Sequence, residues 1–139
     1  MKKRLLSVLL LLALAFTLLP TTALADDDPT VRTVKTPQEL IAALEDDAVT
    51  TIRLLGTEND VLIRSNNSKN VVSRNLTFDM QRNQLRGAGT LTIQENCTLT
   101  IENGGTFGGS IKNHGILIGG GAYIASGVTC YSGAEIKNG

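Results

Sequence analysis

The sequence contains few of the residues that usually carry catalysis or metal binding. Its 139 residues include no Trp, two Tyr, two Cys and a single His, which is His114. One His with two Cys offers no zinc-ligand spacing, so we expect no metal site and no cofactor. The run Gly119–Gly121 lacks the lysine and the following helix of a phosphate-binding loop, and we interpret it as a turn.

Net charge is also lacking, and there is no basic cluster. The chain carries 13 basic and 13 acidic residues, and the segment 1–25 holds three of the basic and none of the acidic ones. Without that segment, 13 − 3 = 10 basic residues face 13 acidic ones, a net charge of −3. Nucleic-acid binding depends on Lys and Arg that neutralise phosphates, so we expect no nucleic-acid partner.

The segment 1–25 has the organisation of a secretory signal peptide. Lys2–Arg4 supplies a positive start, Leu5–Leu19 an apolar core, and Ala23–Ala25 a small-residue cleavage site. We predict cleavage after Ala25, secretion, and no membrane attachment of the remaining chain, which forms one domain. The apolar run is shorter than the roughly 20 residues of a membrane span, which makes an uncleaved anchor the weaker alternative.

No proline follows Pro37, and Pro37 itself marks the start of a helix. Thr36 is a favourable N-cap, Pro37 suits the first helical position, and Glu39 completes a capping box. We predict a flexible leader and a first strand over 26–35, followed by an α-helix over 36–47. The apolar stripe of this helix is expected to cover the open end of a β-structured core.

Glycine is abundant only in the second half of the chain. Thirteen of the 14 glycines lie from Gly87 onward, between short strands such as Leu91–Ile93 and Leu99–Ile101. Short strands that recur with turns between them are typical of solenoids. We therefore predict an all-β fold, a single right-handed parallel β-helix over 48–139 with the short capping helix before it. Its length corresponds to about four to five coils.

The alternation of apolar and polar residues assigns side chains to the core or to the surface. Thr51–Leu54 and Val61–Ile63 are the first two predicted strands of the β-helix, and Ser65–Asn70 is a predicted loop. Thr77, Thr92 and Thr100 are expected to face outward. The expected inward side chains are Leu76, Phe78, Met80, Leu85, Leu91, Ile93, Leu99, Ile101, Phe107, Ile111, Ile116, Ile118, Ile124, Val128 and Ile136.

The two cysteines, Cys97 and Cys130, fall at inward positions of the predicted strands. Export would permit a disulfide between them. The simpler interpretation is two buried core residues on different coils, because free cysteine behaves as a small hydrophobe.

Two strand-rich segments resemble a known family. LTFDMQRNQLRG (Leu76–Gly87) and GTLTIQENCTLTIENGGT (Gly89–Thr106), placed after VKTPQELIAAL, resemble the right-handed parallel β-helix proteins of the pectate-lyase-like superfamily. They are most similar to its adhesin-like exported members in Gram-positive bacteria. The resemblance implies that Thr36–Leu44 caps the first coil. Catalytic members carry grouped aspartates, with an Arg or Lys base in the lyases, and this chain departs from that pattern.

An enzyme of this fold would depend on the carboxylates. After Asp79 only Glu95, Glu102 and Glu135 follow, and no two are adjacent. A β-helix glycosidase needs two carboxylates within roughly 5 to 10 Å across one substrate face. If the chain is a polysaccharide lyase or glycoside hydrolase, its candidates are Asp79, Glu95 and Glu102. We favour solvated surface roles for them and a non-catalytic structural or adhesive module.

Glycan binding without catalysis is a further alternative, with Tyr123, Tyr131 and His114 as its candidate residues. Aromatic rings serve as platforms for sugars, although Tyr in a strand protein also packs against its neighbours. A polysaccharide or a host or cell-surface glycan is the expected partner, met at the cell surface or in the medium.

The segment Ala134–Gly139 is a predicted strand and corner, with nothing after it in the sequence to cover the last coil. An exposed strand edge is a template for further pairing. We expect either that the chain is a portion of a longer surface protein, or that it associates with itself end to end through the uncapped C-terminal coil.

Overall fold

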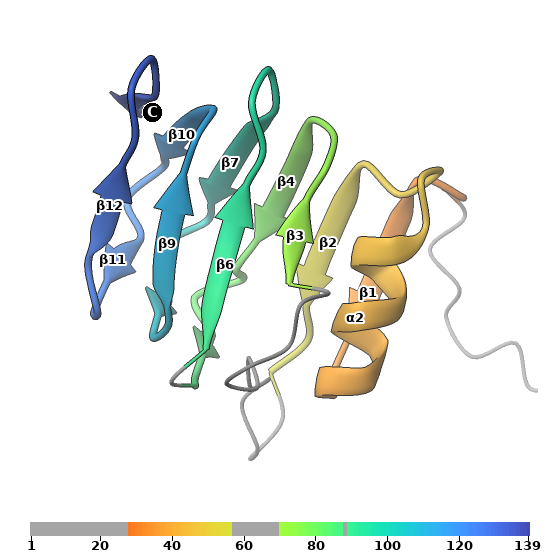
Figure 1. Cartoon of the computed structure of the whole chain (residues 1–139). Helices are drawn as coiled ribbons and strands as arrows, with labels where there is room; N and C mark the ends of the chain where they lie inside the picture. Colours follow the sequence, from red (N-terminus) through yellow and green to blue (C-terminus); the bar gives the residue numbers. More distant parts are fainter. Residues whose placement is uncertain (1–27, 57–69, 88) are drawn as a thin grey trace, which may run out of the picture.

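The computed structural model describes residues 28–56, 70–87 and 89–139 (Figure 1). In these residues the chain forms a parallel β-solenoid of about five turns, with a single short helix near its start. The predicted all-β solenoid with an N-terminal helix is confirmed. The predicted strand Val61–Ile63, and the predicted loop Ser65–Asn70 apart from Asn70 itself, lie outside the described residues.

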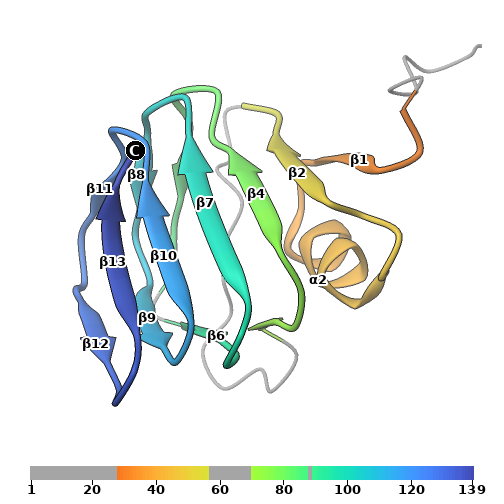
Figure 2. The ribbon, with the colours of Figure 1, turned by 90° about the horizontal axis from the view of Figure 1, so that it is seen from above.

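Three parallel sheets form the walls of the solenoid (Figures 1 and 2). The six-stranded sheet contains, in order, β1 (Val31–Val34), β2 (Thr51–Leu54), β4 (Leu76–Asp79), β7 (Thr98–Glu102), β10 (Ile116–Gly119) and β13 (Glu135–Asn138). The four-stranded sheet contains β3 (Val71–Val72), β6 (Thr90–Ile93), β9 (Ser110–Asn113) and β12 (Val128–Cys130). The three-stranded sheet contains β5 (Gln84–Leu85), β8 (Thr106–Phe107) and β11 (Tyr123–Ile124).

The helix α2 (Pro37–Glu45) lies between β1 and β2 in sequence, within the predicted range. The Thr36 hydroxyl accepts a hydrogen bond from the backbone N–H of Glu39 at 3.3 Å, and the Glu39 carboxylate accepts one from the N–H of Thr36 at 3.0 Å. This is the predicted capping box. The buried residues of the helix, Leu40, Ala43 and Leu44, belong to the core, so the helix covers the first end of the solenoid (Figure 2). No helix among the described residues is long and apolar enough to cross a bilayer.

Arg74 connects the last turn of α2 to the coils through hydrogen bonds. Its guanidinium donates to the backbone carbonyls of Ala43 and Leu44 at 2.8 Å each, and to that of Val49 at 2.6 Å. The final carbonyls of a helix have no partner within the helix, and a positive charge there also interacts favourably with the negative end of the helix dipole. The side chain therefore satisfies groups that the cap would otherwise bury without partners.

One inward column runs through four coils of the six-stranded sheet. Leu76 pairs with Leu99, Leu99 with Leu117, and Leu117 with Ile136. The step along the chain from Leu76 to Leu99 is the longest of the three, and the two later steps are shorter. The later coils are shorter where glycine is abundant, because glycine permits corners of few residues.

The core matches the prediction closely over its middle coils. All eight inward residues predicted from Leu76 to Ile101 are at most 3% exposed. Phe107 and Ile111 are also buried, while Ile124 and Val128 are partly buried against the core. The three threonines Thr77, Thr92 and Thr100 alternate with buried neighbours and lie on the outer side, as predicted.

The predicted inward orientation of Ile116 and Ile118 is wrong. Both are partly exposed and pair with Thr98 and Thr100 on the outer side, whereas Leu117 between them is 1% exposed. An Ile-Leu-Ile strand is apolar at every position, so alternation within it does not identify the inner face. The pairing with the preceding coil decides the orientation instead.

The last coil also departs from the prediction. Ile136 is 56% exposed although it continues the Leu117 column, and Cys130 is exposed although it pairs with the buried Asn113. Among the described residues, β12 and β13 end their sheets, so nothing covers these side chains. Two buried cysteines were predicted, which is correct for Cys97 and wrong for Cys130; both thiols are free.

Candidate functional site

Two predicted ligand-binding residues meet at one corner of the solenoid. His114 follows β9 and Tyr131 follows β12, and these two strands pair in the four-stranded sheet. The backbone N–H of Tyr131 donates to the carbonyl of Asn113 at 3.0 Å, which continues the ladder into the corner. The two rings therefore stack, with centroids 4.0 Å apart and planes inclined by 13°.

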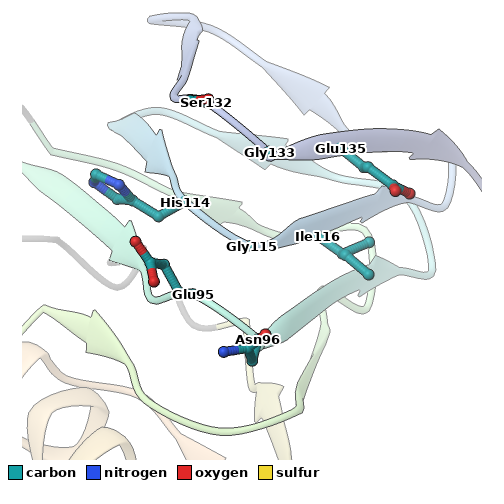
Figure 3. A pocket seen from close by; sticks show the side chains of 8 residues that line it. All are labelled: Glu95, Asn96, His114, Gly115, Ile116, Ser132, Gly133 and Glu135. Carbon is teal, nitrogen blue, oxygen red and sulfur yellow. The ribbon is translucent and has the colours of Figure 1, made fainter.

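His114, one of the two stacked rings, also lines an open pocket of about 380 Å³ (Figure 3). Three successive coils contribute to it, because the corners after β6, β9 and β12 lie above one another. It is lined by Glu95, Asn96, His114, Gly115, Ile116, Ser132, Gly133 and Glu135. Carboxylate, amide, hydroxyl and imidazole groups thus border one hollow, a combination suited to the hydroxyl groups of a sugar.

Asn113 holds the corner in shape from inside the core. Its side chain is fully buried, and its amide NH₂ donates to the backbone carbonyl of Glu135 at 2.9 Å. Its amide oxygen accepts from the N–H of Gly115 at 3.1 Å. The buried amide therefore joins the corner of its own coil to the first residue of the next strand of the six-stranded sheet.

At the same corner, Gly115 has no room for a side chain. A Cβ placed on it would clash with the backbone carbonyl oxygens of Cys97 and of Gln94, the latter at 2.5 Å. These carbonyls cannot move without breaking the neighbouring coil, since Ile116 donates its N–H to the Cys97 carbonyl at 2.9 Å. The close approach of the two corners is what brings His114 near the Glu95 corner.

The two carboxylates that line the pocket do not converge. Figure 3 shows the Glu95 side chain on the His114 side of the pocket and the Glu135 carboxylate directed away from it. Both residues are exposed. Glu135, Asn96 and Ser132 were missed as site residues in the sequence. The number of residues per coil is the signal that identifies Asn96 and Ser132, because they lie at the same corner as His114 on the coils before and after it.

Tyr123 lies elsewhere and does not join Tyr131. It is 67% exposed on β11 and pairs with Thr106 on the outer side of the three-stranded sheet. The two tyrosines therefore do not form a common platform, although both are exposed.

Asp79 occupies a second polar corner and is held tightly. Its carboxylate accepts from the Arg53 guanidinium at 3.1 Å, from the Gln81 amide at 2.8 Å and from the Asn103 amide at 2.7 Å. Burial raises the pKa of Asp79, but the hydrogen bonds from Asn103, Gln81 and Arg53 together outweigh burial and hold the pKa below its ordinary value. The group is an ionised structural acceptor.

The three predicted alternative carboxylates do not form one group. Glu102 pairs with Asp79 across β4 and β7, so these two are close, but only Glu102 is exposed. Glu95 precedes β7 whereas Glu102 ends it, so they lie at opposite ends of one strand.

A neighbouring hollow of about 540 Å³ is lined by Gln81, Arg82, Asn103 and Gly104, all four in turns with positive φ.

Within residues 28–56, 70–87 and 89–139, no group of three or more His, Cys, Asp or Glu side chains is placed to hold a metal ion.

Comparison of the chain with protein-family models, with curated protein sequences and with solved structures gives no match. The fold is a parallel β-solenoid, and it is assigned from the strand pairing alone.

Proposed function

We propose that the chain is an exported, non-catalytic β-helix module that adheres to a polysaccharide or cell-surface glycan at the His114–Tyr131 corner. The observation that carries the proposal is the ring stack, of which His114 also lines a polar pocket. Sugars are bound by aromatic faces or edges together with a few polar groups that orient the hydroxyls. This corner offers both, and it is built on paired strands.

Two further observations favour binding over catalysis at this corner. Glu95 and Glu135 border the same pocket but point in different directions (Figure 3). Glycoside hydrolysis needs two carboxylates that face one glycosidic bond. Asp79, another of the candidate carboxylates, already accepts hydrogen bonds from three side chains.

The sequence pattern supports the cellular part of the proposal. Residues 1–25 have the charge, the apolar core and the small-residue site of a signal peptide. The segments Leu76–Gly87 and Gly89–Thr106 resemble adhesin-like exported members of the pectate-lyase-like superfamily. A module that presents one binding corner on a rigid wall is consistent with that resemblance.

Binding is tested with residues 26–139, which contain every described element, on a panel of immobilised polysaccharides and host glycans. We expect His114→Ala and Tyr131→Ala to weaken binding of the retained glycan by about tenfold each, or about 1.4 kcal/mol. Tyr123→Ala is the matched control, because it removes an exposed tyrosine from another wall. Binding that survives both corner substitutions, or that is lost only in Tyr123→Ala, would contradict the proposal.

The enzyme alternative is tested with the same protein and soluble polysaccharides. New reducing ends would indicate hydrolysis and unsaturated ends would indicate a lyase. We expect neither above the level of a variant carrying Glu95→Ala, Glu102→Ala and Glu135→Ala. Turnover by the unsubstituted chain above that level would overturn the non-catalytic assignment.

A further inference from the structure

Among the described residues, one side of β13 has backbone N–H and C=O groups that pair with no other strand. This strand ends the six-stranded sheet, with β10 on its other side. The N–H of Glu135 donates to the carbonyl of Gly115 at 2.9 Å, and that of Gly139 to the carbonyl of Gly119 at 3.0 Å. Successive residues of a strand direct their N–H and C=O groups to opposite sides. Ile136 and Asn138 therefore direct theirs away from β10, toward an edge that no other described strand covers.

The side chains of β13 are self-complementary about Ile136. Glu135 and Lys137 flank it on the outer side, carry opposite charges, and form an exposed ion pair at 2.8 Å. If a second copy of this strand runs antiparallel with Ile136 opposite Ile136, each Glu135 lies opposite a Lys137. A parallel arrangement in the same register would instead place like charges opposite each other, which destabilises strand pairing.

Apolar surface lies at the same end of the solenoid. Ile136 is 56% exposed, and Ile124 and Val128 are only partly buried. A hollow of about 430 Å³ at this end is lined in part by these three residues and by Leu117. The opposite end of the core is covered by α2, so a second copy cannot stack there head to tail without displacing the helix.

We propose that two copies of this chain join end to end through antiparallel pairing of their β13 strands, about a two-fold axis at Ile136. The two Ile136 residues exchange both N–H···O=C bonds, as in a hydrogen-bonded antiparallel pair. Glu135 then faces Lys137 of the partner subunit in a non-hydrogen-bonded pair, where side chains approach most closely. The interface is isologous, so it closes as a dimer.

The same two-fold axis covers the apolar end. It exchanges the walls on either side of β13, so β11 of one copy lies over β12 of its partner. Ile124 then packs against Val128 of the partner subunit, and the reverse contact forms on the other side. Backbone bonds, charge pairs and apolar contacts all require the same register.

The test is the molar mass of residues 26–139, measured by light scattering and sedimentation in the presence of a reductant, so that disulfides at Cys130 do not contribute. We expect twice the chain mass for the unsubstituted protein and single-chain mass for Glu135→Lys and for Lys137→Glu. An equimolar mixture of these two variants should return to twice the chain mass, because opposite charges face each other again. The double exchange E135K/K137E should also be a dimer.

Several results would overturn the proposal: a monomeric unsubstituted chain, dimers in either single variant, a mixture that stays monomeric, or open-ended assemblies. Circular dichroism and the unfolding midpoint verify that the variants fold, and exposed ion pairs contribute too little for their loss to unfold a chain.

Cross-linking tests the register independently. In a Cys130→Ser background, Ile136→Cys lies on the two-fold axis and should form an intermolecular disulfide on oxidation, because hydrogen-bonded pairs have Cα atoms about 5.5 Å apart. Ala134→Cys is the matched control, since residue 134 does not meet itself. Equal cross-linking of both variants would exclude this register.

Discussion

The two ends of the solenoid differ in how far the core is covered. At the first end, α2 places three apolar side chains on the core and Arg74 binds its last carbonyls. At the other end, the strands of the last coil continue the same columns, but their inward side chains meet no further described residue. Ile136 is 56% exposed, whereas Leu99, two coils earlier in the same column, is 0% exposed.

This difference shows what a solenoid coil contributes by itself. A single coil of about 20 residues loses about 1 to 2 kcal/mol of conformational entropy per residue, and each buried Leu or Ile returns only about 1.5 to 3 kcal/mol. A coil is therefore stabilised chiefly by its neighbours. The first coil has the next coil on one side and α2 on the other. Among the described residues, the last coil has a neighbour on one side only.

The largest expected contrast is between Leu99→Ala and Ile136→Ala. Both remove an inward aliphatic side chain from one column, but only Leu99 is enclosed. We expect Leu99→Ala to lower the free energy of unfolding by about 2 to 5 kcal/mol, and Ile136→Ala by less than about 0.5 kcal/mol in the monomer. Denaturant unfolding of both variants measures this, with the dimer excluded by Glu135→Lys. Similar losses would mean that the open end is covered.

The covered end is tested at Arg74. Arg74→Ala leaves three buried or partly buried carbonyls without their donor, and we expect a loss of about 2 kcal/mol in the free energy of unfolding. Arg74→Lys is the control for charge. It keeps the positive group near the helix end but not the planar fork that reaches three carbonyls, so most of the loss should remain.

Complete rescue by Arg74→Lys would show that charge rather than geometry matters at the helix end. Hydrogen exchange adds a spatial readout. Amides of α2 should exchange faster in Arg74→Ala, while those of β7 and β10 keep their protection, because the cap opens locally.

The sequence predicted the covered half of the molecule better than the open half. Thr36, Pro37 and Glu39 form a local signal, and the helix begins there as expected. Strands with clean alternation, such as Leu91–Ile93, were placed correctly for the same reason. In the last coils the strands are apolar at every position or flanked by glycines, so only pairing with the previous coil decides which side faces inward.

The candidate site could be predicted only in part. His114 and Tyr131 were singled out by residue type, but their contact depends on which corners the pairing of β9 with β12 brings together, and no local pattern reveals that pairing. Asn113 was not predicted at all, because a polar residue in a strand normally indicates the outer side. Its burial is possible only since both ends of its amide find backbone partners.

Near the open end, the side-chain amide of Asn113 connects two successive coils by hydrogen bonds. Asn113→Ala removes the partner of the Glu135 carbonyl and of the Gly115 N–H, and we expect a loss of about 1 to 3 kcal/mol in the free energy of unfolding. Lys112→Ala, on the exposed side of the same strand, should change it by less than about 0.5 kcal/mol. Because the amide does not titrate, the loss should be the same at pH 7 and at pH 3. An Asn113→Ala variant as stable as the unsubstituted chain would mean that the corner has other support.

Nearer the covered end, Asp79 connects successive coils in the same way, but its side chain is charged. It joins Arg53 on β2 to Asn103, which follows β7, so three successive coils depend on one carboxylate. Its pKa in the folded chain is lowered from 3.8, so its stabilising contribution is complete above that value and is lost as the pH falls through the lower folded pKa. We expect Asp79→Asn to be less stable than the unsubstituted chain at pH 7, and the gap to narrow below about pH 4. Unfolding free energies measured from pH 7 to pH 2 test this, and a gap that stays constant over that range would show that the carboxylate is not bound in its ionised form.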